Sequence, residues 1–92
     1  MIVLIATWDL QLEGCQSLKD KRSVLLSLKA ALRKLNLAVA EVEHQELWQR
    51  AGVAAVTVGA DRRVAEETLR AADTLIDALD GVRILETAVT VV

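Results

Sequence analysis

Several residue types are scarce or missing in this chain of 92 residues, and each scarcity excludes a class of protein. Proline is absent, so proline-rich linkers are excluded and regular elements joined by short turns are expected. Phenylalanine and tyrosine are also absent, which leaves Leu, Val, Ile and Ala to build the core around two tryptophans. The single cysteine excludes an internal disulfide and an iron–sulfur cluster, and suits a reducing cytosol.

The charge balance and the length of the chain narrow the possible classes of protein further. A net charge of −2 excludes a polycation, so binding of nucleic acid would need a local basic patch. The opening apolar run, residues 1–6, has no basic residues before it and is far shorter than the roughly 20 apolar residues of a membrane span. We therefore expect one cytoplasmic domain, residues 1–92, with no membrane partner.

Hydrophobic periodicity divides the chain into six elements. Period-two patterns and apolar runs predict strands, and Leu and Ala at helical spacing predict helices that start after Ser17 and Asp61. The predicted ranges are strand 1–12, helix 18–35, strand 37–43, strand 52–59, helix 62–79 and strand 82–91. This β-α-β-β-α-β order predicts a ferredoxin-like α/β fold (an α+β sandwich), with a four-stranded antiparallel sheet and two helices on one face.

Two polar segments stand out, residues 13–22 and residues 43–50. The first contains Cys15, and the second contains the only histidine, His44. In the predicted topology, the connection after the first strand and the hairpin between the second and third strands lie at one end of the molecule. The residues proposed to bind a partner at this end are Lys19, Lys21, Arg22, His44, Gln45, Trp48 and Arg50.

The first predicted helix also carries a basic stripe. Lys19, Arg22, Lys29 and Arg33 recur on one face with Leu26 among them, and residues 18–35 hold six basic residues against one acidic residue. Such a stripe is often only the solvated side of a helix. The functional alternative is a strip that binds RNA or an acidic partner.

The residues at the shared end are compatible with three kinds of chemical site. The helix N-terminus could bind an anion with Lys19, Lys21, Arg22 and Arg50, although Ser17 and Asp20 could already cap it. Cys15 with His44 could form a nucleophilic pair, but a passive, partly buried thiol is favoured because no cysteine signature surrounds it. Glu43, His44 and Glu46 lack the spacing of a zinc site, so neither a metal nor any other cofactor is expected.

The open face of the predicted sheet argues against one mode of RNA binding. RNA-recognition motifs stack bases on aromatic residues of this face, whereas no aromatic residue is expected there. The expected outward set is Val3, Ile5, Thr7, Val39, Glu41, Ala55, Thr57, Ile84, Glu86 and Ala88. An apolar face of small residues predicts a homodimer that packs through it. Trp8 is assigned to the core, and Trp48 is either a lid over the core or a residue that stacks on a partner.

Both polar segments support a family resemblance. Residues 17–22, Ser-Leu-Lys-Asp-Lys-Arg, followed by residues 39–51, Val-Ala-Glu-Val-Glu-His-Gln-Glu-Leu-Trp-Gln-Arg-Ala, resemble the YlxP-like family of small bacterial proteins of unknown function. The resemblance implies the same ferredoxin-like fold and a cytoplasmic bacterial protein. Family genes often neighbour those for translation initiation and ribosome maturation, which suggests a ribosomal RNA or protein partner. The family has no established catalytic residues to carry over.

Taken together, these observations predict a non-enzymatic interaction protein, dimeric and associated with the ribosome or translation machinery. The alternative is a regulatory module that binds a small anionic ligand at the N-terminus of the first helix.

Overall fold

The six expected elements are all present in the computed structural model, which describes all 92 residues. Their order is β1 (Ile2–Leu12), α1 (Leu18–Arg33), β2 (Ala38–Glu43), β3 (Arg50–Gly59), α2 (Arg62–Asp77) and β4 (Val82–Val91). The element boundaries differ from the predicted ones by at most two residues. The largest differences are that β3 starts at Arg50, and that both helices end two residues early.

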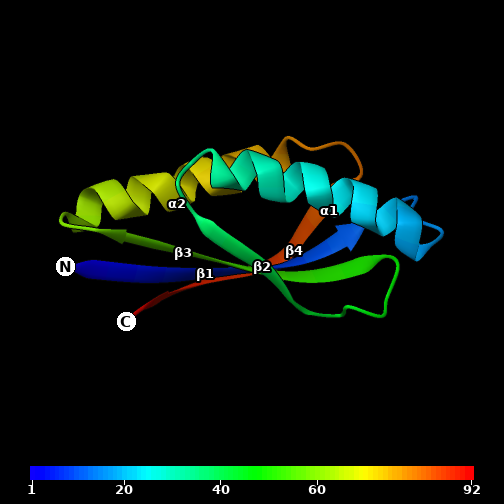
Figure 1. Cartoon of the computed structure of the whole chain (residues 1–92), viewed down its shortest axis with the longest axis horizontal. Coiled ribbons are helices and arrows are strands. Elements are labelled where there is room, and N and C mark those ends of the chain that lie inside the picture. The colour runs from blue at the N-terminus through cyan, green and yellow to red at the C-terminus, as the bar shows by residue number, and fades with distance from the viewer.

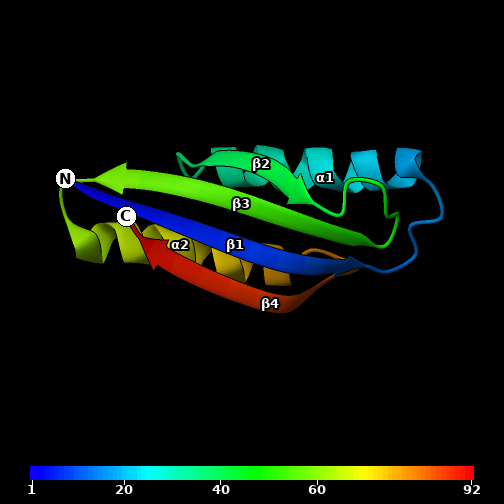
Figure 2. The same cartoon turned by 90° about the horizontal axis from the view of Figure 1, so that it is seen from below.

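The strands form one antiparallel sheet in the order β2-β3-β1-β4, and both helices cover one of its faces (Figure 1). Figure 2, seen from below, shows the other face free of helices. The β1–α1 connection, the β2–β3 hairpin and the α2–β4 turn lie together at one end, and the two termini lie at the other (Figure 2). This arrangement is the predicted ferredoxin-like fold.

Local signals explain where α1 and α2 begin and end. Ser17 and Asp61 are extended N-caps whose side chains accept from backbone N–H groups of the first turn. Beyond α1, Asn36 adopts φ 63°, a left-handed conformation that stops a helix. Gly81, with φ 75°, closes the α2–β4 turn, and its carbonyl accepts from the N–H of Glu13 at 2.8 Å. That bond joins this turn to the end of β1.

The core lies between the sheet and the helices. Trp8 is its largest member and is 1% exposed, with Leu and Ala side chains of α1 and α2 above it. Its indole Nε1–H donates to Oδ1 of Asp73 on α2 at 2.6 Å, so the one polar atom of this side chain is satisfied. The assignment of Trp8 to the core is therefore confirmed.

The buried face of α1 departs from a pure leucine stripe at its first turn. Leu18 is 40% exposed, whereas Lys21 is buried with Leu25, Leu28 and Leu32. A lysine, which the hydrophobic pattern assigned to solvent, thus occupies a position that faces the sheet.

The predicted outward set of the sheet is wrong at five positions, and the register explains why. Val39, Glu41, Ala55, Thr57 and Ile84 face the helices, because each lies in register with an inward residue or packs against the core. Ala55, for example, pairs with Ala6 of β1, and Ile84 pairs with Leu10. A register shift opposite Asp9 and Leu10 then lets Glu86 and Ala88 face outward, as predicted.

The open face that the register defines carries no aromatic side chain on which bases could stack, as the sequence predicts. No helix is both long enough and apolar enough to cross a membrane.

Candidate functional site

Lys21 of α1 is a buried cation that joins the two polar segments, and only 2% of it is exposed. Its Nζ donates to the carbonyl oxygens of His44 at 2.6 Å and Leu47 at 2.7 Å. It also lies 2.8 Å from Oε2 of Glu41 on β2. A third, longer hydrogen bond of 3.5 Å goes to the carbonyl of Gln45, so the three N–H donors of the ammonium are used within the loop, beside the ion pair with Glu41. The segments touch, and Lys21 has no free donor for a partner, which corrects its assignment to a binding surface.

Further hydrogen bonds hold the β2–β3 loop in place. Gln49 Nε2 donates to the carbonyl of Cys15 at 3.1 Å, and the N–H of Leu12 donates to the carbonyl of Gln49 at 2.9 Å. Leu47 and Trp48 project from this anchored loop and are 49% and 51% exposed. Trp48 is therefore not a lid over the core. It borders a shallow hollow of about 370 Å³ formed by residues 46–50.

The N-terminus of α1 is closed by its own side chains. The N–H of Asp20 donates to Oγ of Ser17 at 3.1 Å, and the N–H of Gln16 donates to Oδ2 of Asp20 at 3.0 Å. This pairing follows the logic of a capping box and leaves a carboxylate beside the first turn. With Lys21 also engaged, the geometry does not favour an anion at this helix end.

Cys15 lies in the core and is 4% exposed. Burial, with a smaller contribution from the nearby Asp20 carboxylate, raises the pKa of its thiol, and Lys21 only partly opposes this. A raised pKa keeps the sulfur protonated, which is the unreactive form. No hydrogen bond joins Cys15 to His44, so the structure does not assemble a nucleophilic pair from them.

The imidazole of His44 lies instead on the open face of the sheet. Its Nε2 is 3.8 Å from Oδ1 of Asp9 and 4.0 Å from Oε2 of Glu43. Asp9 also receives two hydrogen bonds from Arg50, at 2.6 and 3.2 Å. The charge of Arg50 is thus neutralised within the protein. No group of three or more His, Cys, Asp or Glu side chains is placed to hold a metal ion.

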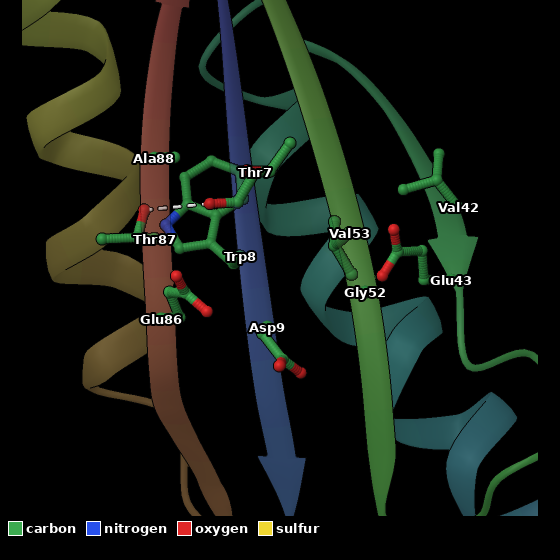
Figure 3. A pocket seen from close by; sticks show the side chains of 10 residues that line it. All are labelled: Thr7, Trp8, Asp9, Val42, Glu43, Gly52, Val53, Glu86, Thr87 and Ala88. Carbon is green, nitrogen blue, oxygen red and sulfur yellow. Dashed lines mark hydrogen bonds between the residues drawn. The ribbon is translucent and has the colours of Figure 1, made fainter.

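A polar hollow of about 280 Å³ opens on the same face. Figure 3 shows Asp9 on β1 and Glu43 on β2, on either side of Gly52 of β3, with Glu86 on β4 beyond Asp9. Because Gly52 has no side chain, β2 and β3 approach closely there. The hollow is acidic at its rim, and so it does not suit an anionic ligand.

The basic stripe of α1 is the largest set of free cations in the protein. None of the six ion pairs involves Lys19, Arg22, Lys29 or Arg33. All four are exposed except Lys29, which is half-buried, and Leu26 among them is 68% exposed. We call these five residues the α1 strip.

The position of the α1 strip follows from what α1 packs against. Ser23, Val24 and Ser27 line a depression with residues 79–82 at the end of α2, so this side of α1 faces α2. Helical spacing puts the strip on the opposite flank, beside the edge strand β2. On α2, by contrast, Arg62 and Arg63 are paired with Glu66 and Glu67.

The structure thus separates the seven predicted binding residues into four groups. Lys19 and Arg22 lie on the strip, and Gln45 and Trp48 lie on the exposed loop. Lys21 is buried, while His44 and Arg50 interact with Asp9 on the sheet face.

Two residues that organise this end, Asp9 and Glu41, were not among the predicted ones. Their only sequence signal is an acidic side chain within an apolar strand.

A comparison with known protein families identifies the family of this chain. A family described as "Protein of unknown function (DUF503)" matches residues 3–89. No curated protein matches the chain. The match confirms the coarser part of the resemblance, a family of unknown function, whereas the YlxP-like name itself stays a prediction.

Proposed function

The chain belongs to the DUF503 family, whose function is unknown, and we propose that it is a non-enzymatic interaction protein that binds RNA along the α1 strip. The proposal rests on where the unpaired cations of the protein lie. Lys21, Arg50, Arg62 and Arg63 form ion pairs, and the other three unpaired cations, Lys34, Arg70 and Arg83, lie outside the strip. By contrast, Lys19, Arg22, Lys29 and Arg33 are all unpaired together on one flank.

The shape of the strip suits a phosphate backbone. From residue 19 to residue 33 a helix rises about 21 Å, which spans several successive phosphates. Lys and Arg that contact phosphates bind without regard to sequence and release counterions. Leu26 adds an apolar surface at the centre of the strip.

Trp48 supplies a second kind of contact. Lys21 holds the β2–β3 loop against the first turns of α1, so the indole is exposed near the end of the strip where α1 begins. A base that stacks on an exposed aromatic ring contributes about 1–3 kcal/mol in single-strand binders. In this proposal, the strip contacts the backbone and Trp48 stacks on one base.

The partner that we propose is ribosomal RNA in the bacterial cytoplasm. The α1 strip supports an RNA partner, and the resemblance suggests the ribosome as the particle to test first. Co-sedimentation with ribosomal subunits should occur at low salt and weaken at moderate salt. Protein that stays at the top of the gradient at both salt concentrations would argue against the ribosome.

The sharper test measures binding of a labelled single-stranded RNA by fluorescence anisotropy at several salt concentrations. Four phosphate contacts predict a slope of about −3 in a plot of log affinity against log salt. Arg22→Gln with Arg33→Gln should reduce this slope by about half. Arg62→Gln with Arg63→Gln removes the same charge from α2 and should leave the slope unchanged. Equal losses in the two double variants would show that only net charge matters, and would contradict the proposal.

Trp48→Ala separates stacking from charge. It should weaken binding about tenfold, because a stacking contact is lost, while the salt slope stays the same. Affinity equal to that of the unaltered protein would remove Trp48 from the interface.

A further inference from the structure

We propose that a second copy of this chain packs on the uncharged half of the open sheet face. This surface lies on the other side of the sheet from α1, and its test does not depend on RNA binding. Three features of this face support a second copy there: the rows of side chains that cross the strands, the charge of these rows and their size.

The strand register arranges the outward side chains in rows that cross all four strands. One row is Ala38, Val56, Ile5 and Thr90, and the next is Ala40, Ala54, Thr7 and Ala88. Val3 and Val58 extend the first row toward the end that carries the termini. We call these two rows with Val3 and Val58 the uncharged patch. Val58 is 61% exposed and Val56 is 37% exposed, both on β3.

The third row differs completely from the first two. It contains Glu43, Gly52, Asp9 and Glu86, so three of its four residues are acidic. Charge is therefore confined to one half of the face. An RNA partner does not fit the uncharged patch, because the patch has no cation to contact a phosphate.

This division of charge determines how a second copy can lie on the face. If a two-fold axis passes near Ile5 and Val56, each uncharged patch meets the other, and an isologous contact forms. The two acidic rows then lie at opposite ends, about 27 Å apart at the usual rise per strand residue. That separation exceeds the screening length of about 8 Å in physiological salt, so the rows do not repel each other. Two sheets stacked this way would be about 10 Å apart.

The size of the patch predicts the strength of the contact. The patch spans five residues on β1 and β3 and three residues on β2 and β4, which project an area of about 250 Å² per copy. The total of about 500 Å², increased by the relief of the side chains, is that of a small and weak interface. A reversible dimer that dissociates on dilution is therefore expected, not a permanent one.

The free edge of β4 is the competing surface. Residues 87–92, Thr-Ala-Val-Thr-Val-Val, contain no charge and no proline, and strands with such edges can pair with another chain. On the helix side, however, half of the residues that line the neighbouring groove are charged, namely Arg62, Glu66, Arg70 and Asp73, and these groups favour contact with water. The uncharged patch has no such groups, and we therefore place the second copy on the patch.

Sedimentation velocity over a range of protein concentrations tests the proposal. The expected result is a reversible shift from the 10.0 kDa monomer to twice that mass. Val58→Lys should raise the dissociation constant about tenfold or more, because an unpaired ammonium would be buried at the contact. Val89→Lys, on the helix side of β4 where Val89 is 55% exposed, is the matched control and should leave the dimer intact.

Both side chains are exposed, so neither lysine should unfold the monomer, and circular dichroism checks this. A protein that stays monomeric at every concentration would overturn the proposal. A dimer lost in Val89→Lys and kept in Val58→Lys would overturn it as well, and would place the contact at the β4 edge. Val56→Cys in a Cys15→Ser background supplies a second readout, since a thiol beside a two-fold axis should form a disulfide between copies.

Discussion

Lys21 Nζ lies 2.8 Å from Oε2 of Glu41, and both side chains are enclosed between α1 and β2 with 3% and 16% exposure. A buried ion pair costs desolvation on both sides, and the carbonyls of His44 and Leu47 help to offset this cost. The pair fixes the β2–β3 loop against α1. It therefore positions the exposed Trp48 although it contacts no partner itself.

Removing one member of this ion pair should strongly destabilise the folded protein. Lys21→Met leaves the Glu41 carboxylate enclosed without a counter-charge, and we expect a loss of about 3 kcal/mol in the free energy of unfolding. Lys21→Met combined with Glu41→Met should recover much of that loss, because no unpaired charge remains. Chemical denaturation measures all three proteins. Lys19→Met on the exposed strip is the control and should change the stability little.

If Lys21→Met were as mild as Lys19→Met, the buried pair would not stabilise the protein. If the double variant were no better than Lys21→Met, the loss would come from the loop carbonyls and not from Glu41.

The close approach of β2 and β3 at Gly52 predicts a second effect. A Cβ added at Gly52 would lie 2.7 Å from Cβ of Glu43 and 3.3 Å from its backbone. Gly52→Ala should therefore push the strands apart and cost about 1–3 kcal/mol. Gly59→Ala at the end of the same strand meets nothing closer than 3.9 Å and should be nearly neutral. Thermal unfolding of the two variants compares them directly, and similar melting temperatures would contradict the register.

The buried thiol of Cys15 predicts how both its reactivity and the stability of the protein change with pH. Because burial raises its pKa in the folded protein, the thiol should react with iodoacetamide only at higher pH than a free cysteine, whose pKa is about 8.5. The folded state disfavours the thiolate, so stability is fully present below the unfolded pKa and is lost as pH rises above it. Between neutral and alkaline pH, the unaltered protein should lose more stability than Cys15→Ala does.

Alkylation in denaturant supplies the reference for the unfolded thiol. Equal rates and equal pH profiles in the folded and denatured protein would show that Cys15 is accessible, contrary to its 4% exposure.

The two tryptophans should be distinguishable by fluorescence. Trp8 is 1% exposed and Trp48 is 51% exposed, so Trp48→Phe should leave a blue-shifted emission that acrylamide quenches poorly. Trp8→Phe should leave a red-shifted, readily quenched emission. It should also lower the stability, because the Asp73 carboxylate loses its indole donor. Equal quenching of the two variants would contradict the exposure of Trp48.

The sequence by itself determined the element order, because hydrophobic periodicity and helix caps depend only on near neighbours in the chain. Ser17 and Asp61 marked the starts of the two helices, which the structure confirms. The topology then followed, and it brought the two polar segments to one end. The basic stripe on α1 was equally readable, since it needs only helical spacing.

Only the tertiary structure decided which charges are free. The pattern assigned Lys21 to solvent, but its ammonium finds acceptors on the carbonyls of a loop more than twenty residues away. The inward or outward direction of β2, β3 and much of β4 was also decided by pairing, because one residue of slip reverses every side chain. Long-range register and buried hydrogen bonds depend on contacts between distant parts of the chain. Local patterns do not record such contacts, and so the free α1 strip and the uncharged patch emerged only from the folded molecule.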